Sequence, residues 1–391
     1  TGVEGDFEKS LIAAFEKENP SIKVHFTLIS FTDGAEKIEK AIAEGKAPDI
    51  IYDAPGRIIN WAEKGLLEPL DDVLATEKPY ITAILLAVSA GKDRRTYMYP
   101  MHEGAFSMAF NKEMLEDLNL INLLPYKRSD RSWSVAEYEK LLTALKQKLP
   151  KDKTPGVFYC KNTGGDQGTR AFLVNLYGNA NLINEDYSKY IFNSEQAVKN
   201  LQWTVRAVKN GLLFDGTSLT SNDAIAWFAE SKAAHTILYS PQLNKMYDGK
   251  RKYKGKDFTP IYMPFPNDSG SPSLEFLAGG ACIFKNKDGI KIKAAKRFLH
   301  FAATDEVWAE KLVAATGAFP ATSKIKIDSQ DNEILYNSVL QRFFGQYYNN
   351  IAGFSQMRSY WNQALKDALA GKNVQDVLDN FVNKANTSFA E

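Results

Sequence analysis

The stretch from Tyr97 to Lys112 constrains the fold of this chain most strongly. It reads Tyr-Met-Tyr-Pro-Met-His-Glu-Gly-Ala-Phe-Ser-Met-Ala-Phe-Asn-Lys, which indicates an extended segment that leaves one lobe and enters another, with polar groups at the crossing. Residues 47–53 (Ala-Pro-Asp-Ile-Ile-Tyr-Asp) are typical of a buried strand that ends in a polar turn. A strand end and a crossing that both carry polar side chains favour a cleft between two lobes. The pattern therefore predicts a protein that closes on a ligand rather than a catalyst.

Length and charge narrow the class of protein further. A chain of 391 residues is too long for one small core and suggests two domains. Lys and Arg number 48 against 47 Asp and Glu, so neither nucleic acid nor an anionic membrane is expected as a partner. No apolar run approaches the roughly 20 residues that span a bilayer. The chain opens without a signal peptide or an initiator Met, so we expect a processed or truncated product.

The cysteines and histidines give no sign of a metal or a cofactor. Cys160 and Cys282 could form one disulfide or remain two buried thiols, and we favour buried thiols because free cysteines are commonly buried. The four histidines are scattered, and no Cys/His spacing resembles a zinc site. We therefore expect no cofactor and no metal.

Helical and strand patterns alternate along the chain, which predicts an α/β fold with largely parallel sheets. Helices are expected at residues 6–18, 32–44, 57–64, 170–177, 194–209, 222–230 and 290–314, and from 334 onward. Strands are expected at residues 22–26, 48–52, 154–160, 235–239 and 274–284. Another helix should start at Ser134, with Glu137 completing a capping box. Residues 162–169 are predicted to form a polar turn. Residues 248–275, which are basic at first and then rich in Pro and Ser, are expected to be a loop region whose basic run forms a solvated surface hairpin.

With these pieces in order, the chain resembles the extracytoplasmic solute-binding proteins of ABC importers, in the carbohydrate-binding family that includes maltose-binding protein. Each motif alone is weak, but together they cover nearly the whole chain. The matching segments are 47–53, 61–72 (Trp-Ala-Glu-Lys-Gly-Leu-Leu-Glu-Pro-Leu-Asp-Asp), 99–112, 133–138 (Trp-Ser-Val-Ala-Glu-Tyr), 226–234 (Ala-Trp-Phe-Ala-Glu-Ser-Lys-Ala-Ala), 317–321 (Gly-Ala-Phe-Pro-Ala) and 355–361 (Ser-Gln-Met-Arg-Ser-Tyr-Trp).

The resemblance implies a two-lobe periplasmic-binding-protein-like fold of type II, in which each lobe is a mostly parallel sheet flanked by helices. It implies an N-terminal lobe of residues 1–103 and 265–316 and a C-terminal lobe of residues 104–264 and 317–391. It also implies a monomer outside the cytoplasm, a cell-surface lipoprotein or a periplasmic protein, that captures a carbohydrate by hinge closure and delivers it to permease subunits. One departure stands out, because such proteins usually begin with a hydrophobic strand before the first helix, and none precedes Asp6 here. We expect that the first segment is missing from the chain.

Candidate ligand-binding residues in the first half of the chain each have an alternative structural role. Asp53 follows a buried strand and could accept hydrogen bonds from sugar hydroxyls, or it could cap the next helix. Arg57, one turn later, could contact the ligand or form a surface salt bridge. His102 and Glu103 lie at the crossing, where the alternative is a hinge hydrogen bond. The resemblance places the family's sugar-binding acid at Gly104, one residue after Glu103.

The middle of the chain offers a second group of candidates. Asp166, Gln167 and Arg170 lie in or after a Gly-rich turn whose backbone N–H groups could approach a ligand. The turn lacks the Lys-Ser/Thr ending of a phosphate loop. Tyr239 and Gln242 lie at a strand end that a proline breaks.

Trp361 matches the family's stacking tryptophan, and the resemblance implies that sugar C–H faces pack on its indole ring. The alternative is a core tryptophan at helical spacing. Arg358 lies about one turn before it, and Phe276 and Gly279 belong to the second crossing region.

The identity of the ligand stays open at this level. Arg57, Arg170 and Arg358 hint at an acidic sugar, since guanidinium binds carboxylate in a bidentate manner. A neutral oligosaccharide is the first choice, while a polyol, a glycerophosphodiester or a peptide is an alternative. An enzyme acting on glycans is the alternative of a different class, but apart from Asp53 and Glu103 nothing suggests the carboxylate pair of a glycosidase.

Overall fold

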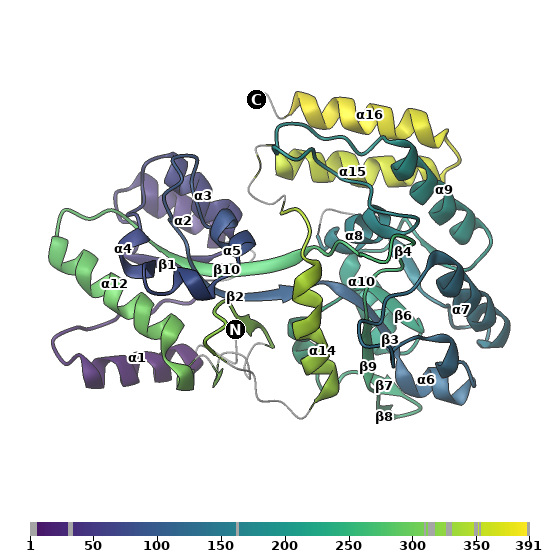
Figure 1. Cartoon of the computed structure of the whole chain (residues 1–391), viewed down its shortest axis with the longest axis horizontal. Helices are drawn as coiled ribbons and strands as arrows, with labels where there is room; N and C mark the ends of the chain where they lie inside the picture. The colour runs from purple at the N-terminus through teal and green to yellow at the C-terminus, as the bar shows by residue number, and fades with distance from the viewer. Residues whose placement is uncertain are drawn as a thin grey trace. The chain divides into compact units, whose positions relative to one another are not determined.

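The structure is a computed structural model that describes residues 6–29, 34–161, 164–308, 310–311, 317–325, 331–347, 351 and 353–388. The chain divides into two compact units, one of residues 1–104 and 277–328 and one of residues 105–276 and 329–391. These boundaries differ from the expected ones, because residues 265–276 group with the second unit and residues 317–328 with the first. Strands β2 (Tyr99–Ala105) and β10 (Phe276–Ile283) carry the chain across two of the boundaries (Figure 1).

The first unit is built on a four-stranded sheet in the order β1-β10-β2-β11, where β1 is Ile50–Asp53 and β11 is Phe319–Pro320. Strand β1 pairs antiparallel with β10, and β11 pairs antiparallel with β2. The expectation of largely parallel strands is therefore wrong for these pairs. In each of these two pairs the strands come from segments more than 200 residues apart, so no single crossover helix forces them to run in the same direction.

One predicted strand of the first unit is not formed. Residues 22–26 have no strand pairing, and the run 22–29 carries the exposed side chains of Phe26 (39%) and Leu28 (56%). An extended segment becomes a strand only when a partner satisfies its backbone groups. No strand formed by the described residues pairs with this run, and the N–H of Val24 donates instead to Oε1 of Glu16 at 2.9 Å.

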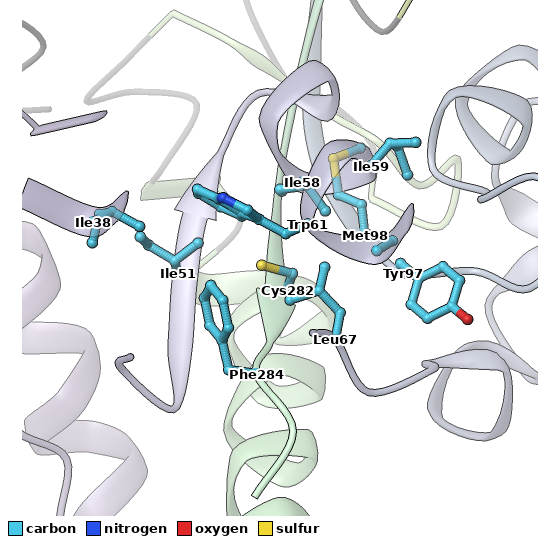
Figure 2. Close-up of a cluster of buried hydrophobic side chains, with 11 residues drawn as sticks. Ile38, Ile51, Ile58, Ile59, Trp61, Leu67, Tyr97, Met98, Cys282 and Phe284 are labelled. Carbon is cyan, nitrogen blue, oxygen red and sulfur yellow. The ribbon is translucent and has the colours of Figure 1, made fainter. Parts of the chain in front are cut away.

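Helices pack on the sheet of the first unit and bury its hydrophobic core. They are α1 (Asp6–Glu18), α2 (Gly34–Ala43), α3 (Pro55–Glu63), α4 (Asp71–Leu74), the 3-10 turn η2 (Lys78–Tyr80), α5 (Ala83–Val88) and α12 (Gly289–Thr304). Figure 2 shows Ile51, Trp61 and Phe284 gathered with the thiol of Cys282 in this core. Cys160 and Cys282 are both free and buried, which confirms the thiol prediction.

The described residues of the second unit form three small sheets. The largest has the order β6-β3-β9, with β6 at His235–Tyr239, β3 at Ser107–Asn111 and β9 at Pro260–Met263, and both of its pairings are antiparallel. Strands β4 (Val157–Tyr159) and β5 (Phe214–Gly216) pair in parallel. The predicted surface hairpin is confirmed as β7 (Lys252–Tyr253) and β8 (Lys256–Asp257). Strand β9 was not predicted, because it lies in the Pro- and Ser-rich region that we expected to be a loop.

Helices surround these sheets, and two of them, α15 and α16, pack against each other near the C-terminus (Figure 1). The helices and 3-10 turns are α6 (Lys112–Asp117), η3 (Ile121–Leu123), α7 (Val135–Lys148), α8 (Gln167–Asn175), α9 (Glu195–Lys209), α10 (Ser221–Ala229), α11 (Pro241–Met246), α14 (Asn332–Leu340), η4 (Gln341–Phe343), α15 (Phe354–Leu369) and α16 (Val374–Thr387). The capping box of Ser134 and Glu137 is confirmed. None of the helices formed by the described residues is long and apolar enough to cross a membrane.

Candidate functional site

Asp53 and Arg57 form a local ion pair in the first unit. Asp53 ends β1, and its Oδ1 accepts a hydrogen bond from the N–H of Ala54 at 2.7 Å. Nε of Arg57 donates to Oδ2 of Asp53 at 2.6 Å, and this bond raises the pKa of the guanidinium. The N-cap of α3 is Ala54, so Asp53 does not fill the alternative role of helix cap. Its carboxylate neutralises Arg57 while both side chains keep some exposed surface.

His102 and Gly279 come together around an aromatic residue that sequence reasoning missed. The hydroxyl of Tyr52 lies 2.5 Å from Nδ1 of His102, and the two rings stack at 5.5 Å. A Cβ on Gly279 would collide with both side chains where they now lie, so glycine at this position of β10 allows their close approach. Burial lowers the pKa of His102 to about 4, which leaves the ring neutral at pH 7. Tyr52 is 47% exposed, as the alternation of side chains along β1 could have indicated.

Glu103 is the neighbouring residue on β2 and is 3% exposed. Its Oε2 is buried and has no hydrogen-bond partner. Burial raises the pKa of this carboxyl from 4.5 to about 8. A protonated carboxyl at pH 7 can both donate and accept a hydrogen bond, which suits an uncharged hydroxyl partner.

In the second unit, Asp166, Arg170 and Arg358 are brought together in one charge network. Nη1 of Arg170 donates to Oδ2 of Asp166, and Nε of Arg358 donates to Oδ1 of Asp166 at 2.9 Å. Sequence reasoning missed the fourth member, Glu275, which accepts from Nε of Arg170 at 2.7 Å. The spacing of Asp166 and Arg170 is readable in the sequence, but Glu275 lies 105 residues further on.

The glycines of the predicted ligand turn serve packing instead. Helix α8 begins at Gln167, earlier than the expected residue 170. A Cβ on Gly168 would lie 2.8 Å from both the backbone oxygen of Ile237 and Cβ of Leu238 on β6. The close approach of α8 to β6 therefore explains this glycine without a ligand.

Gln167 and Gln242 carry buried polar atoms without partners. Gln167 is the first residue of α8, and Gln242 is the second residue of α11, which follows β6. Oε1 of Gln167 and both Oε1 and Nε2 of Gln242 are buried without a hydrogen bond. These atoms can take part in further hydrogen bonds, because native proteins satisfy nearly all of their buried polar groups. Tyr239, by contrast, is fully buried, and its hydroxyl donates to Oδ1 of Asn244 at 3.1 Å.

Trp361 and Phe276 belong to the core of the second unit. Trp361 has no exposed surface, packs against Phe192 at 5.1 Å, and donates from Nε1 to Oγ1 of Thr169 at 3.1 Å. Phe276 is 3% exposed and stacks on Phe344 at 4.3 Å. Both rings are buried within the second unit, and for Trp361 this burial fits the alternative of a core tryptophan.

The described residues contain no group of three or more His, Cys, Asp or Glu side chains that could hold a metal ion. The chemistry on offer is hydrogen bonding by neutral groups (Glu103, Gln167 and Gln242) together with arginines that already have carboxylate partners.

Comparison with known proteins places these features in a family. The profile of bacterial extracellular solute-binding proteins matches residues 1–309. A multiple sugar-binding protein of Streptococcus mutans is 23% identical over 313 residues, which cover 76% of this chain and 67% of that protein. A binding protein of Brucella abortus is 28% identical over 119 residues, and the match spans only 29% of its length.

Solved structures agree over the whole chain. The sugar-binding protein MalE from Xanthomonas citri superposes with a TM-score of 0.81 at 17% identity, covering 100% of this chain and 95% of that one. A cyclic alpha-maltosyl-1,6-maltose binding protein from Arthrobacter globiformis gives a TM-score of 0.79 at 16% identity, covering 100% and 96%. At these identities the likeness shows the fold alone, and it confirms the expected α/β periplasmic-binding-protein fold.

Proposed function

The chain belongs to the family of bacterial extracellular solute-binding proteins, and on this premise we propose that it captures a neutral oligosaccharide outside the cytoplasm and delivers it to the permease subunits of an ABC transporter. The multiple sugar-binding relative and the maltosyl-maltose-binding neighbour support the ligand class. The family supports the extracytoplasmic location. We expect a monomer that binds and releases its ligand unchanged.

The observation that carries the proposal is the set of buried, unpartnered polar atoms on Glu103, Gln167 and Gln242. These groups come from three segments that the sequence had already marked as ligand-binding. A neutral carboxyl and two carboxamides can each donate and accept hydrogen bonds, as sugar hydroxyls require. Leaving such groups unpaired costs free energy that a bound sugar would recover.

Charge balance favours an uncharged ligand over an acidic one. Each of the three candidate arginines (Arg57, Arg170 and Arg358) already contacts at least one carboxylate of the protein. An acidic sugar would bring a further negative charge to an arginine whose charge a carboxylate of the protein already balances. The acidic-sugar alternative therefore has less support than the sequence suggested.

A thermal-shift screen with neutral oligosaccharides, uronic acids, polyols and peptides tests the proposal. A ligand at a hundredfold excess over its dissociation constant stabilises the folded protein by roughly 2.7 kcal/mol. We expect a neutral oligosaccharide to raise the melting temperature of the wild-type protein, and we expect Gln242→Ala to reduce this rise. Gln147→Ala, at an exposed position on α7, is the matched control. A shift with uronic acids or peptides alone would contradict the proposal.

Incubation with the same oligosaccharide should leave it intact. The appearance of new reducing ends would favour the glycan-active enzyme instead.

A further inference from the structure

The chain passes between its two units three times, after Gly104, Phe276 and Asp328. Close to these boundaries on the side of the second unit lie two glutamates, Glu275 and Glu333. The carboxylate of each glutamate accepts two hydrogen bonds from one arginine, a geometry that fixes the distance and the orientation between the two side chains. We call each of these arginine–glutamate pairs an arginine clamp. The arginines come from elsewhere in the second unit.

The first arginine clamp joins Arg170 to Glu275. Nε and Nη2 of Arg170 donate to Oε1 and Oε2 of Glu275 at 2.7 and 2.8 Å. The backbone oxygen of Glu275 also accepts from the N–H of Phe106 at 2.9 Å. Phe106 follows the first boundary by two residues, and Glu275 precedes the second by two. One clamp therefore holds the two neighbouring crossings.

The clamp of Glu275 is anchored deeply. Arg170 is fully buried on α8, and Asp166 ties it to Arg358 on α15. Signs of charge alternate along Glu275, Arg170, Asp166 and Arg358, so the buried charges compensate each other. Opening the contact between Arg170 and Glu275 would leave the buried carboxylate of Glu275 without its arginine, which is strongly unfavourable.

The second arginine clamp joins Arg131 to Glu333, the second residue of α14. Nη1 and Nη2 of Arg131 each donate to one carboxylate oxygen at 2.7 Å. Nη1 also donates to the backbone oxygen of Tyr262 on β9, and the guanidinium lies 3.9 Å from the ring centre of Tyr336. The backbone of Arg131 has a φ of 51°, which residues other than glycine rarely adopt. The contacts of its guanidinium therefore hold a strained backbone conformation in place. The clamp fixes the start of α14, which enters the second unit after the third boundary.

We infer that Arg170 and Arg131 are positioning residues that lock the second-unit ends of the first two crossings and the start of α14, so that the backbone of these clamped residues does not rotate during ligand capture. The role in capture rests on the proposed function, whereas the locking itself does not. Two separate arginine–glutamate pairs each lie beside a point where the chain enters or leaves the second unit, and this supports the same positioning role for both arginines. Lysine could not replace either arginine, because it lacks the planar fork.

Amide hydrogen exchange of the ligand-free protein tests the locking directly. Glu275→Gln should speed exchange of the Phe106 amide at least about tenfold, and Glu333→Gln should do the same for the amides of α14, as the loss of a charged, buried hydrogen bond implies. Exchange of the Tyr138 amide in the buried face of α7 should not change. Glu137→Gln is the matched control, because it removes an exposed arginine–glutamate pair of the same unit.

Uniform acceleration at every amide, or no change near the crossings, would overturn the inference. Arg131→Lys keeps the charge but loses the fork, so it should behave like Glu333→Gln; wild-type exchange in this variant would also overturn it. If Glu275→Gln fails to fold, the Arg131 and Glu333 variants decide the question.

Maltotriose binding measured by calorimetry then tests the role in capture. We expect each clamp variant to bind maltotriose about tenfold more weakly than the Glu137→Gln control, since looser crossings add ordering cost to binding. Equal affinity in all variants would remove the role in capture while the exchange data still decide the locking. Failure of the wild-type protein to bind any sugar in the screen would count against the proposed function and not against the clamps.

Discussion

Replacing Glu103 by glutamine should change how the stability of the protein depends on pH. The carboxyl is buried on β2, and its pKa rises from 4.5 to about 8 on folding. Below pH 4.5 the carboxyl is protonated in both the folded and the unfolded protein, so its ionisation does not change the free energy of unfolding. Between pH 4.5 and 8 the unfolded chain loses the proton and the folded protein keeps it, so the stability of the wild-type protein falls as pH rises.

The size of the effect follows from the pKa difference. Each pKa unit corresponds to about 1.4 kcal/mol. At pH 7 the buried carboxyl therefore lowers the free energy of unfolding by roughly 3 kcal/mol relative to a side chain that does not ionise. At pH 5 it lowers this free energy by less than about 1 kcal/mol. Glutamine has nearly the same shape and never ionises. Glu103→Gln should thus gain stability over the wild type as the pH is raised from 5 to 8.

Urea denaturation of both proteins at half-unit intervals from pH 5 to 8.5 measures this difference. Near-ultraviolet circular dichroism at each pH checks that the two folds agree. Parallel stability curves would refute the reasoning, because they would mean that Glu103 has the same pKa in the folded and unfolded chains. A difference that grows toward low pH would refute it as well.

Three further predictions follow from burial and close packing. Gly279→Ala should destabilise the protein by about 1–3 kcal/mol in urea denaturation, since its methyl group has no room beside the stacked rings; unchanged stability would show that the rings move aside freely. Cys160 and Cys282 should resist a thiol reagent until the chain unfolds, because burial raises the pKa of both thiols, that of Cys160 to about 12; rapid labelling of the native protein would contradict their burial. Trp361→Ala should cost about 3–5 kcal/mol of stability and leave the sugar affinity of the folded protein unchanged; lost affinity without lost stability would restore the stacking role.

Local features of the fold were predictable from the sequence because nearby residues determine them. The capping box of Ser134 and Glu137 needs only three residues of spacing, and β6 and α1 have the bounds that their apolar periodicity indicated. Residues 22–26 have the same kind of pattern and form no strand. A strand needs a partner, and whether one is present is a property of the whole sheet.

The candidate site likewise has features that the sequence predicts and features that only the tertiary structure reveals. The order of motifs indicates the family. The crossing, the Gly-rich turn and the strand end at Pro241 make Glu103, Gln167 and Gln242 candidates, and each carries a buried polar atom without a hydrogen-bond partner. Only the tertiary structure decided that Trp361 is buried and that Glu275 completes the charge of Arg170. Burial and ion pairing depend on residues from distant parts of the chain, and sequence spacing does not encode which of them meet. The sequence by itself therefore determined the family and the local elements, while tertiary packing decided which polar side chains are buried and which of them pair with one another.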